Sequence, residues 1–421
     1  MSKRIKIKEI GAYFLANSIG AITPFVLIPI LTESVTPSEY GQLAIFQSLI
    51  FLYTALSGMN SNGYLLRGNY GSSDEKKSEI IASILQLLIV AFLFLCLTSW
   101  AVKELFAQPS LKYSWLYGCL VVSVFNFLIQ MRLVQWQYTG NVGCYFVLQV
   151  ALSLVNLFTS ILLIKIFDTS ADGRVLAMVI SYVLFGGGAF FLVYKQYLKL
   201  SVLSKINKSE IIKVLKFGVP LMPHVIGIFI FTTVDKIILG EYVGYSTLGV
   251  FFLAYQISSL YRLIFDAMNK VYTPYLYSVL SSPTAPKKLA LVRVSYMLLI
   301  LISLFGFVGV WGAENLLIYF VDEKFYEASI YIPLLIASQC FGGAYLLFTG
   351  YLFYYGKTWL ISKVTLFVGL LNIVLVIFTI PYYGAFGVAW VFLISKIIQF
   401  ALVCYLAKRE AKLSWDKNNY V

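Results

Sequence analysis

The apolar residues of this sequence fall into long windows, separated by short segments rich in charged residues, glycine and proline. Most windows hold about 20 residues, the length that an α-helix needs to cross the hydrocarbon of a bilayer. They predict helices near 11–32, 41–63, 80–101, 113–131, 142–164, 175–194, 217–239, 247–269, 294–312, 330–353, 359–380 and 386–406. The expected fold class is therefore an all-α integral membrane protein with twelve transmembrane helices.

The composition supports a membrane location and excludes several classes of function. Of 421 residues, 60% are hydrophobic and only 12% are charged. Twelve spanning helices leave about 14 residues for each connection, which is too short to fold as a catalytic domain. We therefore exclude a soluble enzyme and a nucleic-acid-binding protein, and we expect membrane lipids to surround the chain.

The basic residues predict the orientation in the membrane. With a cytoplasmic amino terminus, 23 of the 32 lysines and arginines fall on the cytoplasmic side, five on the opposite side and four within helices. Cytoplasmic connections of membrane proteins carry an excess of basic residues. Both termini are therefore predicted to be cytoplasmic, and the net charge of +13 needs no further partner.

Matching spacings in the two halves indicate an internal repeat. Gly140 precedes Asn156 by 16 residues, and Gly356 precedes Asn372 by the same interval. The repeat predicts two six-helix lobes, 1–205 and 206–421, of equal orientation. Two such lobes suit alternating access, in which one lobe rocks against the other around a central cavity.

Prolines mark the first helix of each predicted lobe. Pro24 and Pro29 lie in the first, and Pro220 and Pro223 in the second. Proline removes a backbone hydrogen bond, so both helices are expected to kink or hinge there. Prolines are also common in membrane helices in general, which leaves a purely structural interpretation open.

Cations within or beside the predicted helices are the candidate substrate-binding residues. A charge in hydrocarbon costs at least about 2.5–3.5 kcal/mol, so it is expected to face a cavity or a partner. The candidates are Lys396, Arg262, Lys236, Arg67, Arg132 and Lys363. Because these cations outnumber the nearby carboxylates, a cavity that they line would favour an anionic substrate.

Each candidate also has a structural alternative. Lys396 could pair with a buried carboxylate, Arg262 with the carboxylate four residues later on its own helix, and Lys236 could extend its ammonium to the membrane surface. Arg67, Arg132 and Lys363 could simply be positive charges that fix the orientation.

Three residues are candidates for ion coupling: Asp235, Asp266 and His224. His224 is the only histidine and follows two prolines, so it could carry a proton or bond to a carbonyl that a proline leaves free. No nucleophile, nucleotide-binding or zinc motif is found, and the five cysteines show no paired spacing. We expect neither a cofactor nor a metal site.

The sequence resembles a family of transporters. The features are the run Lys-Phe-Gly-Val-Pro-Leu-Met-Pro-His at 216–224, the segment Asp-Lys-Ile-Ile-Leu-Gly at 235–240, and Tyr40-Gly41 at the start of the second helix. They are similar to polysaccharide-type flippases for O-antigen or capsule repeat units, in the multidrug/oligosaccharidyl-lipid/polysaccharide exporter superfamily. The resemblance extends over nearly the whole chain.

The resemblance implies two MATE-like bundles in a bacterial inner membrane. Their cationic cavity would accept the diphosphate and sugars of an undecaprenyl-diphosphate-linked oligosaccharide, with the prenyl chain in the lipid. Other polysaccharide assembly proteins would be possible partners. The charges of the family's cavity correspond here to Lys236 and Asp235. Lysine, unlike arginine, cannot form a bidentate pair of hydrogen bonds with phosphate.

Two other functions are considered. A drug or metabolite exporter of the same architecture is less favoured, because deep carboxylates, which would suit cationic drugs, are scarce. A membrane polymerase or ligase for polysaccharides usually displays a large outer loop. Here the longest predicted outer connection is about 313–329, so we expect a transporter and not an enzyme.

Overall fold

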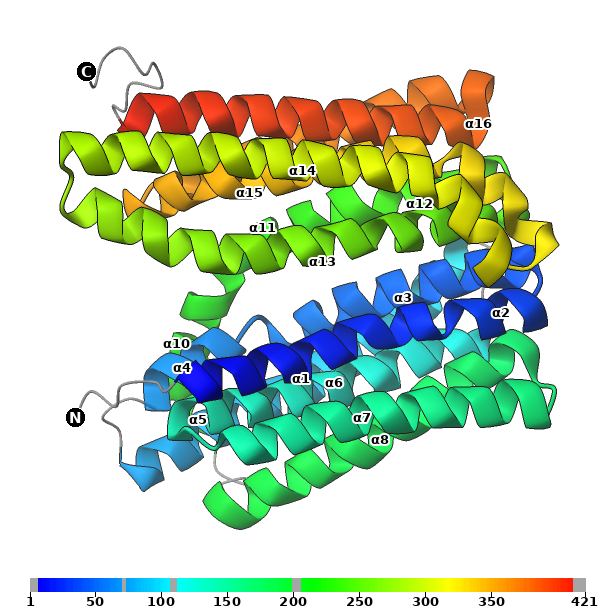
Figure 1. Cartoon of the computed structure of the whole chain (residues 1–421). Helices are drawn as coiled ribbons and strands as arrows, with labels where there is room; N and C mark the ends of the chain where they lie inside the picture. The colour runs from blue at the N-terminus through cyan, green and yellow to red at the C-terminus, as the bar shows by residue number, and fades with distance from the viewer. Residues whose placement is uncertain (1–6, 70–72, 107–111, 199–205, 412–421) are drawn as a thin grey trace. The chain divides into compact units, whose positions relative to one another are not determined.

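The computed structural model describes residues 7–69, 73–106, 112–198 and 206–411, and every regular element in these ranges is a helix (Figure 1). The side chains of Arg67 and His224 lie outside what it describes. A bilayer accepts helices because they satisfy their own backbone hydrogen bonds. The prediction of an all-α membrane protein is confirmed.

The chain forms two compact units. Unit 1 contains residues 1–35 and 42–229, and unit 2 contains residues 36–41 and 230–421. The predicted boundary at 205/206 followed from the internal repeat, which the compactness of the units does not test. The repeat and its two lobes therefore stay predictions.

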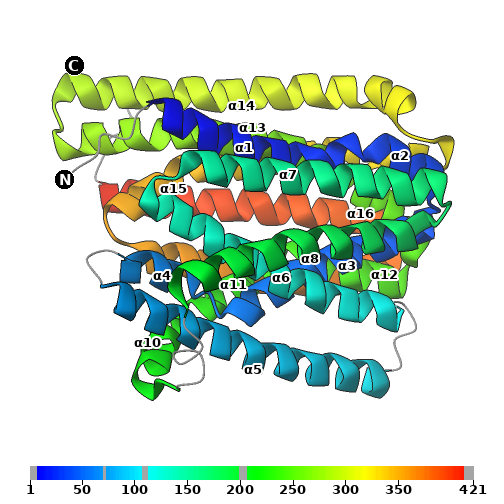
Figure 2. The same cartoon turned by 90° about the horizontal axis from the view of Figure 1, so that it is seen from below.

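Unit 1 is a bundle with α6 in its interior. Its elements are α1 (Ile7–Val26), α2 (Ile28–Ser34), α3 (Pro37–Gly58), α4 (Asn62–Asn69), α5 (Asp74–Phe106), α6 (Tyr113–Thr139), α7 (Val142–Ile161), η1 (Leu162–Ile166), α8 (Ser170–Tyr197), α10 (Lys208–Gly218), η2 (Val219–Leu221) and α11 (Met222–Phe229). One apolar core joins α6 to α4, α5, α8 and α10, and another joins it to α1, α7 and α8. In Figure 2, α10 runs beside α5.

Unit 2 is built around α13, α15 and α16. Its elements are η3 (Ile230–Val234), α12 (Asp235–Tyr242), α13 (Tyr245–Ser281), α14 (Ala285–Phe320), η4 (Glu323–Ile330), α15 (Ile332–Tyr354) and α16 (Thr358–Ala411). The element α16 consists of two helices joined at a kink, where Gly384 has φ 52° and ψ −138°. Glycine adopts this left-handed conformation without the steric penalty that a Cβ atom imposes.

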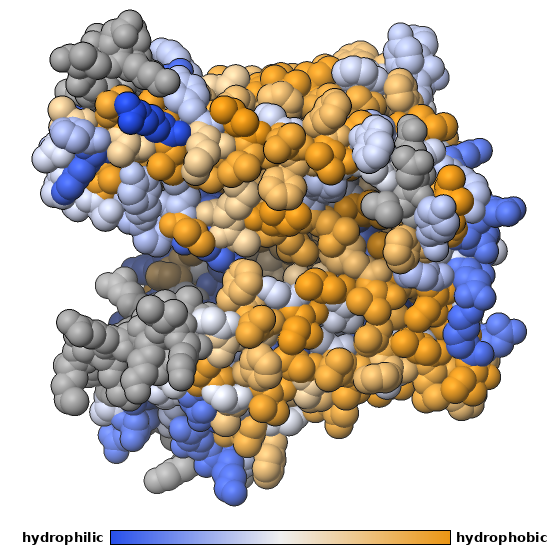
Figure 3. All heavy atoms as spheres, viewed as in Figure 1, coloured by the Kyte–Doolittle hydropathy of each residue, from blue (hydrophilic) through white to orange (hydrophobic). Residues whose placement is uncertain are grey.

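Eleven helices of the described chain are long and apolar enough to cross a membrane. The last of these spans covers 53 residues, about 80 Å of helix against about 30 Å of hydrocarbon, so it is long enough to cross twice around its kink. Large apolar side chains lie exposed along the helices (Figure 3), as expected of surfaces that face lipid.

The proline-marked helices are interrupted. Leu27 separates α1 from α2, with Pro24 inside α1 and Pro29 in the first turn of α2. Pro220 lies in the short 3₁₀ turn η2 between α10 and α11. The element η3 that follows is a π-helix, a form that often occurs at functional positions.

Residues 36–41 form part of unit 2 because they pack closely against α13. A Cβ atom on Gly41 would lie 2.1 Å from the Tyr245 carbonyl oxygen, and one on Gly249 would lie 1.8 Å from the Pro37 carbonyl oxygen. The Tyr40 hydroxyl donates to Gln256 Oε1 over 2.9 Å. Only glycine permits backbones to approach so closely.

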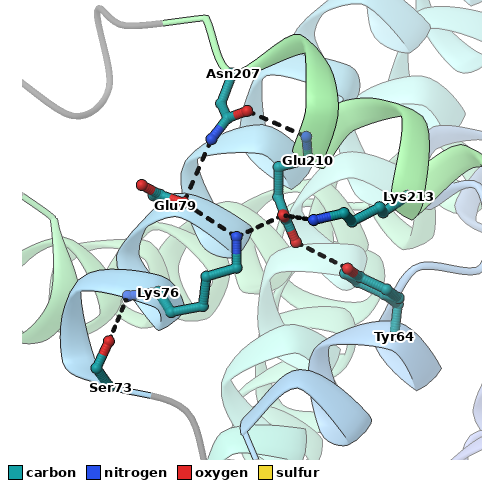
Figure 4. A network of polar contacts seen from close by, with 7 residues as sticks. All are labelled: Tyr64, Ser73, Lys76, Glu79, Asn207, Glu210 and Lys213. Atoms are coloured by element: carbon teal, nitrogen blue, oxygen red, sulfur yellow. Dashed lines mark hydrogen bonds and ion pairs between the residues drawn. The ribbon is translucent and has the colours of Figure 1, made fainter.

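A polar network holds α10 against the rest of unit 1 (Figure 4). The buried Glu210 carboxylate accepts from the Lys76 ammonium at 2.6 Å and from the Tyr64 hydroxyl at 2.8 Å. Asn207 caps α10 by accepting from the Glu210 backbone N–H, and its amide donates to Glu79. The network ties α10 to α4 and α5.

Replacing Glu210 with glutamine should lower the free energy of unfolding by about 1–2 kcal/mol, because the ion pair with Lys76 is lost while a polar side chain remains. Lys213→Gln is the matched control, because Lys213 is half exposed and contacts the same carboxylate at 3.4 Å. Denaturation midpoints in detergent would measure both. An equal shift for the two variants would contradict a special role for the Lys76–Glu210 pair.

Candidate functional site

Asp235 and Lys236 form a buried ion pair at the start of α12. Their side chains are 1% and 2% exposed, and the Lys236 Nζ lies 3.6 Å from Asp235 Oδ1. The ammonium also donates to the carbonyl of Thr232 in η3, and it lies 4.0 Å from the centre of the Tyr255 ring on α13. Three neighbours therefore compensate for the loss of water around this cation.

The expectation that Lys236 reaches the membrane surface is wrong. Its side chain points into unit 2, where an anion, a carbonyl and an aromatic face replace water. A lysine extends to the interface when its charge has no partner in the interior. Sequence alone gave no indication of Tyr255, which is 19 residues away along the chain.

Lys396 lies in the second part of α16 and has aromatic rings as its main neighbours. Its Nζ is 4.3 Å from the centre of the Phe231 ring and 5.6 Å from that of Phe392, and it lies 3.3 Å from Gln399 Oε1. None of the ion pairs between described residues includes Lys396. The alternative of a structural pair with a buried carboxylate finds no support.

Aromatic contacts connect these two lysines. Phe231 stacks on Phe392 with ring centres 5.8 Å apart, and Tyr255 meets Phe392 edge to face, also at 5.8 Å. We call Phe231, Lys236, Tyr255, Phe392 and Lys396 the lysine–aromatic cluster. Among the described residues, Asp235 is the one carboxylate that pairs with the cluster, so its two lysines give it a net positive charge among aromatic faces.

Such a cluster suits a substrate that has both anionic groups and sugar rings. An ammonium bonds strongly to phosphate oxygens, and aromatic faces pack against the apolar faces of sugars. The half-buried Lys396 is the more accessible of the two cations, because Lys236 already has three partners. Lys396 is therefore the best candidate for direct contact with a substrate.

The remaining candidates occupy different surroundings. Arg262 pairs with Asp266 at 3.8 Å, as their spacing on α13 predicted, and the arginine is exposed. Lys363 is exposed on α16, with its Nζ 4.6 Å from the centre of the Trp359 ring. Arg132 belongs to unit 1 and is buried between α6 and α8. Arg67 and His224 cannot be placed, since their side chains lie outside the described residues.

Sequence analysis missed a second buried arginine. Arg174 lies in the first turns of α8, is 5% exposed, and donates to Asn156 Oδ1 at 2.8 Å and to the Ser160 hydroxyl at 2.7 Å. Arg174 directly precedes the predicted helix 175–194, a position where a basic residue usually belongs to a connection. The spacing that singled out Asn156 was the available signal, since a buried amide needs a polar partner.

The described residues contain no group of three histidine, cysteine, aspartate or glutamate side chains that could hold a metal ion. The arrangement that the structure does contain, cations beside aromatic rings within membrane-spanning helices, can bind and release a ligand.

Comparison with known proteins gives one family match and two relatives. A family described as "Polysaccharide biosynthesis protein" matches residues 7–279. "Lsg locus putative protein 1" of Haemophilus influenzae is 22% identical over 90% of this chain and 94% of its own length. An "uncharacterized membrane protein" of the same organism is 25% identical, over 90% and 89%.

Solved structures of similar fold are transporters by their descriptions. An inward-facing multidrug resistance transporter of the MATE family and MOP superfamily has a TM-score of 0.73 at 13% identity, over 95% of this chain and 98% of its own. The lipid II flippase MurJ, in an inward closed conformation, has a TM-score of 0.74 at 16% identity, over 96% and 88%. This chain has the fold that they share.

Proposed function

Since the chain belongs to the polysaccharide biosynthesis protein family, we propose that it flips lipid-linked oligosaccharide repeat units from the cytoplasmic to the outer leaflet of a bacterial inner membrane. The carrier would be undecaprenyl diphosphate, as in the flippases that the sequence resembles. The observation that carries the proposal is the lysine–aromatic cluster, a positively charged group of aromatic side chains within helices that cross the bilayer.

The topology belongs to the same proposal. If α16 crosses the membrane twice around Gly384, the eleven spans make twelve crossings, and both termini lie on one side. The distribution of basic residues favours the cytoplasm as that side. Two MATE-like lobes would then exchange access between the two sides of the membrane.

The physical task explains why a lipid-linked sugar needs such a protein. Each hydroxyl or phosphate that enters hydrocarbon without a partner costs several kcal/mol. A protein lowers this barrier by supplying hydrogen bonds, cations and aromatic faces while the prenyl chain stays in lipid. The lysine–aromatic cluster offers these groups, and Lys396 has no carboxylate partner to displace among the described residues.

The second candidate function is export of drugs or metabolites, which the likeness to the MATE-family transporter favours at the level of fold. The net positive charge of the cluster is suited to anions and opposes binding of the cationic compounds that a carboxylate would attract. We therefore rank the flippase first.

Deletion of the protein from its own bacterium should cause a lipid-linked oligosaccharide to accumulate in the inner leaflet and reduce surface polysaccharide. A membrane-impermeant glycosidase would be added to vesicles of known orientation. Whether it cleaves the sugar would show which leaflet holds the lipid-linked oligosaccharide. Expression of the intact protein should restore the distribution. An unchanged distribution together with greater drug sensitivity would contradict the flippase and support the exporter.

A further inference from the structure

A polar pocket lies inside unit 1, separate from the lysine–aromatic cluster of unit 2. It has a volume of about 410 Å³ and is bounded by the ends of α6 and α8 and the start of α7. Its lining residues are Arg132, Gln135, Trp136, Thr139, Gly140, Asn141, Gln196 and Tyr197. Arg132, Gln135 and Trp136 are buried, whereas Thr139, Gly140 and Asn141 are exposed and form its mouth.

Arg132 is a buried cation that pairs with no carboxylate of the described residues. It is 6% exposed, and its Nη1 donates to Gln135 Oε1 at 2.9 Å and to Gln196 Oε1 at 2.8 Å. Its guanidinium carbon lies 4.7 Å from the centre of the Trp136 ring. No carboxylate lines the pocket, and none of the ion pairs between described residues includes Arg132.

Two buried donors of this pocket have no hydrogen-bond acceptor among the residues that the structure describes. They are Arg132 Nε and Gln135 Nε2. A buried N–H without a hydrogen bond is destabilising, and more so when it belongs to a charged group. Arginine presents its donors in a planar fork that matches the oxygens of phosphate. These donors, which have no acceptor among the described residues, suit the oxygens of a bound phosphate.

The backbone around the pocket also favours an anion. The last carbonyls of α6 would repel one, but those of Gln135, Trp136 and Gln137 already accept hydrogen bonds from Thr139, Gly140 and Asn141. Gly140, with φ 71°, allows this tight end of the helix. The helix α7 begins at Val142, directly after the pocket residue Asn141, so the positive end of its dipole lies at the mouth.

We propose that this pocket binds a phosphate group, either in the headgroup of an anionic phospholipid or as free phosphate. Two fork donors of Arg132 and the amide of Gln135 would contact the oxygens. The predicted orientation places the ends of α6 and α8 at the cytoplasmic surface, where anionic lipids are common. The proposal concerns a site in unit 1 and does not depend on flipping.

The test is equilibrium binding to the purified full-length protein in nonionic detergent, followed by native mass spectrometry. The probes are dioctanoyl phosphatidylglycerol, dioctanoylglycerol, which lacks the phosphate, and inorganic phosphate. The variants are Arg132→Gln and Gln135→Leu. Lys195→Gln is the matched control, because it removes one exposed positive charge beside Gln196 on the same end of α8.

We expect phosphatidylglycerol to bind, dioctanoylglycerol not to bind, and inorganic phosphate to compete. Arg132→Gln should weaken binding by about tenfold or more, because a charge-assisted bond to phosphate is lost. Gln135→Leu should weaken it less, and Lys195→Gln by less than about twofold at moderate salt. Binding of inorganic phosphate alone, lost in Arg132→Gln, would assign the site to free phosphate.

Equal binding by the unaltered protein and Arg132→Gln would overturn the proposal and leave Arg132 a structural residue solvated by water. Equal binding of phosphatidylglycerol and dioctanoylglycerol would also overturn it. If Arg132→Gln cannot be purified, Arg132→Lys replaces it, since lysine keeps the charge but loses the planar fork. Phosphate binding unchanged in both Arg132→Lys and Gln135→Leu would then reject the site.

Discussion

Lys236→Met is expected to lower the free energy of unfolding by about 3–5 kcal/mol, because it leaves the buried Asp235 carboxylate without its cation. Among the described residues, Asp235 would retain one hydrogen bond, from the backbone N–H of residue 236 at 2.8 Å. Methionine fills a similar volume, so the loss would come mainly from charge and not from packing. Unfolding in mixed micelles of rising denaturant content would measure the change.

The double variant Asp235→Asn with Lys236→Met tests whether the loss of stability comes from the unpaired charge of Asp235. It removes both ions together, so its stability should return to within about 1 kcal/mol of the unaltered protein. The double variant should nevertheless flip more slowly than the unaltered protein, because the lysine–aromatic cluster has lost one of its two cations. A double variant as unstable as the single one would contradict the ion-pair explanation. Normal flipping by a stable double variant would limit Lys236 to a structural role.

The membrane-spanning parts of the fold could be predicted because hydropathy reports directly on contact with lipid. The ends of the helices could not be predicted in this way, since helices continue past the hydrocarbon. The helix predicted at 113–131 extends to Thr139, directly before the pocket residues Gly140 and Asn141. The kink at Gly384 lies in the short gap between the predicted helices 359–380 and 386–406.

The surroundings of each charge were harder to predict than its presence. The spacing of Arg262 and Asp266 gave their ion pair, because four residues on a helix bring side chains together. The neighbours of Lys396, by contrast, include Phe231, which is 165 residues away along the chain. Contacts between distant helices depend on how each helix is rotated, and apolar residues on every face hide that rotation from a sequence pattern.

The same limit applies to two arginines: Arg132 was predicted as a cavity cation or an orientation charge, and Arg174 was not predicted as a site residue. Arg132 and Arg174 stand near the ends of apolar windows, where a basic residue usually marks an exposed connection. Both are buried, and their first partners are amides and a hydroxyl instead of carboxylates. The partner of Arg174, Asn156, lies within the predicted helix 142–164. The partners of Arg132, which are Gln135 and Gln196, follow the predicted helices 113–131 and 175–194. Such amides can be examined before an arginine is assigned to the surface.

Lys396→Ala should reduce the initial rate of flipping by about 10- to 100-fold, because the substrate loses a charge-assisted hydrogen bond of about 1.5–3 kcal/mol. The cation has no carboxylate partner among the described residues, so its removal leaves no buried anion behind. Protein level and denaturation midpoint should therefore change little. Reconstituted proteoliposomes with a lipid-linked oligosaccharide, assayed with an impermeant glycosidase, would measure the rate.

Two further variants distinguish charge from position at Lys396. Lys396→Arg keeps a cation over Phe231 and Phe392 and should retain most of the rate. Lys357→Ala, which removes an exposed lysine before α16, should have no effect. If Lys396→Ala flips as fast as Lys357→Ala, the ammonium of Lys396 does not contact the substrate. Loss of rate in Lys396→Arg as well would show that the shape of lysine, and not only its charge, is required.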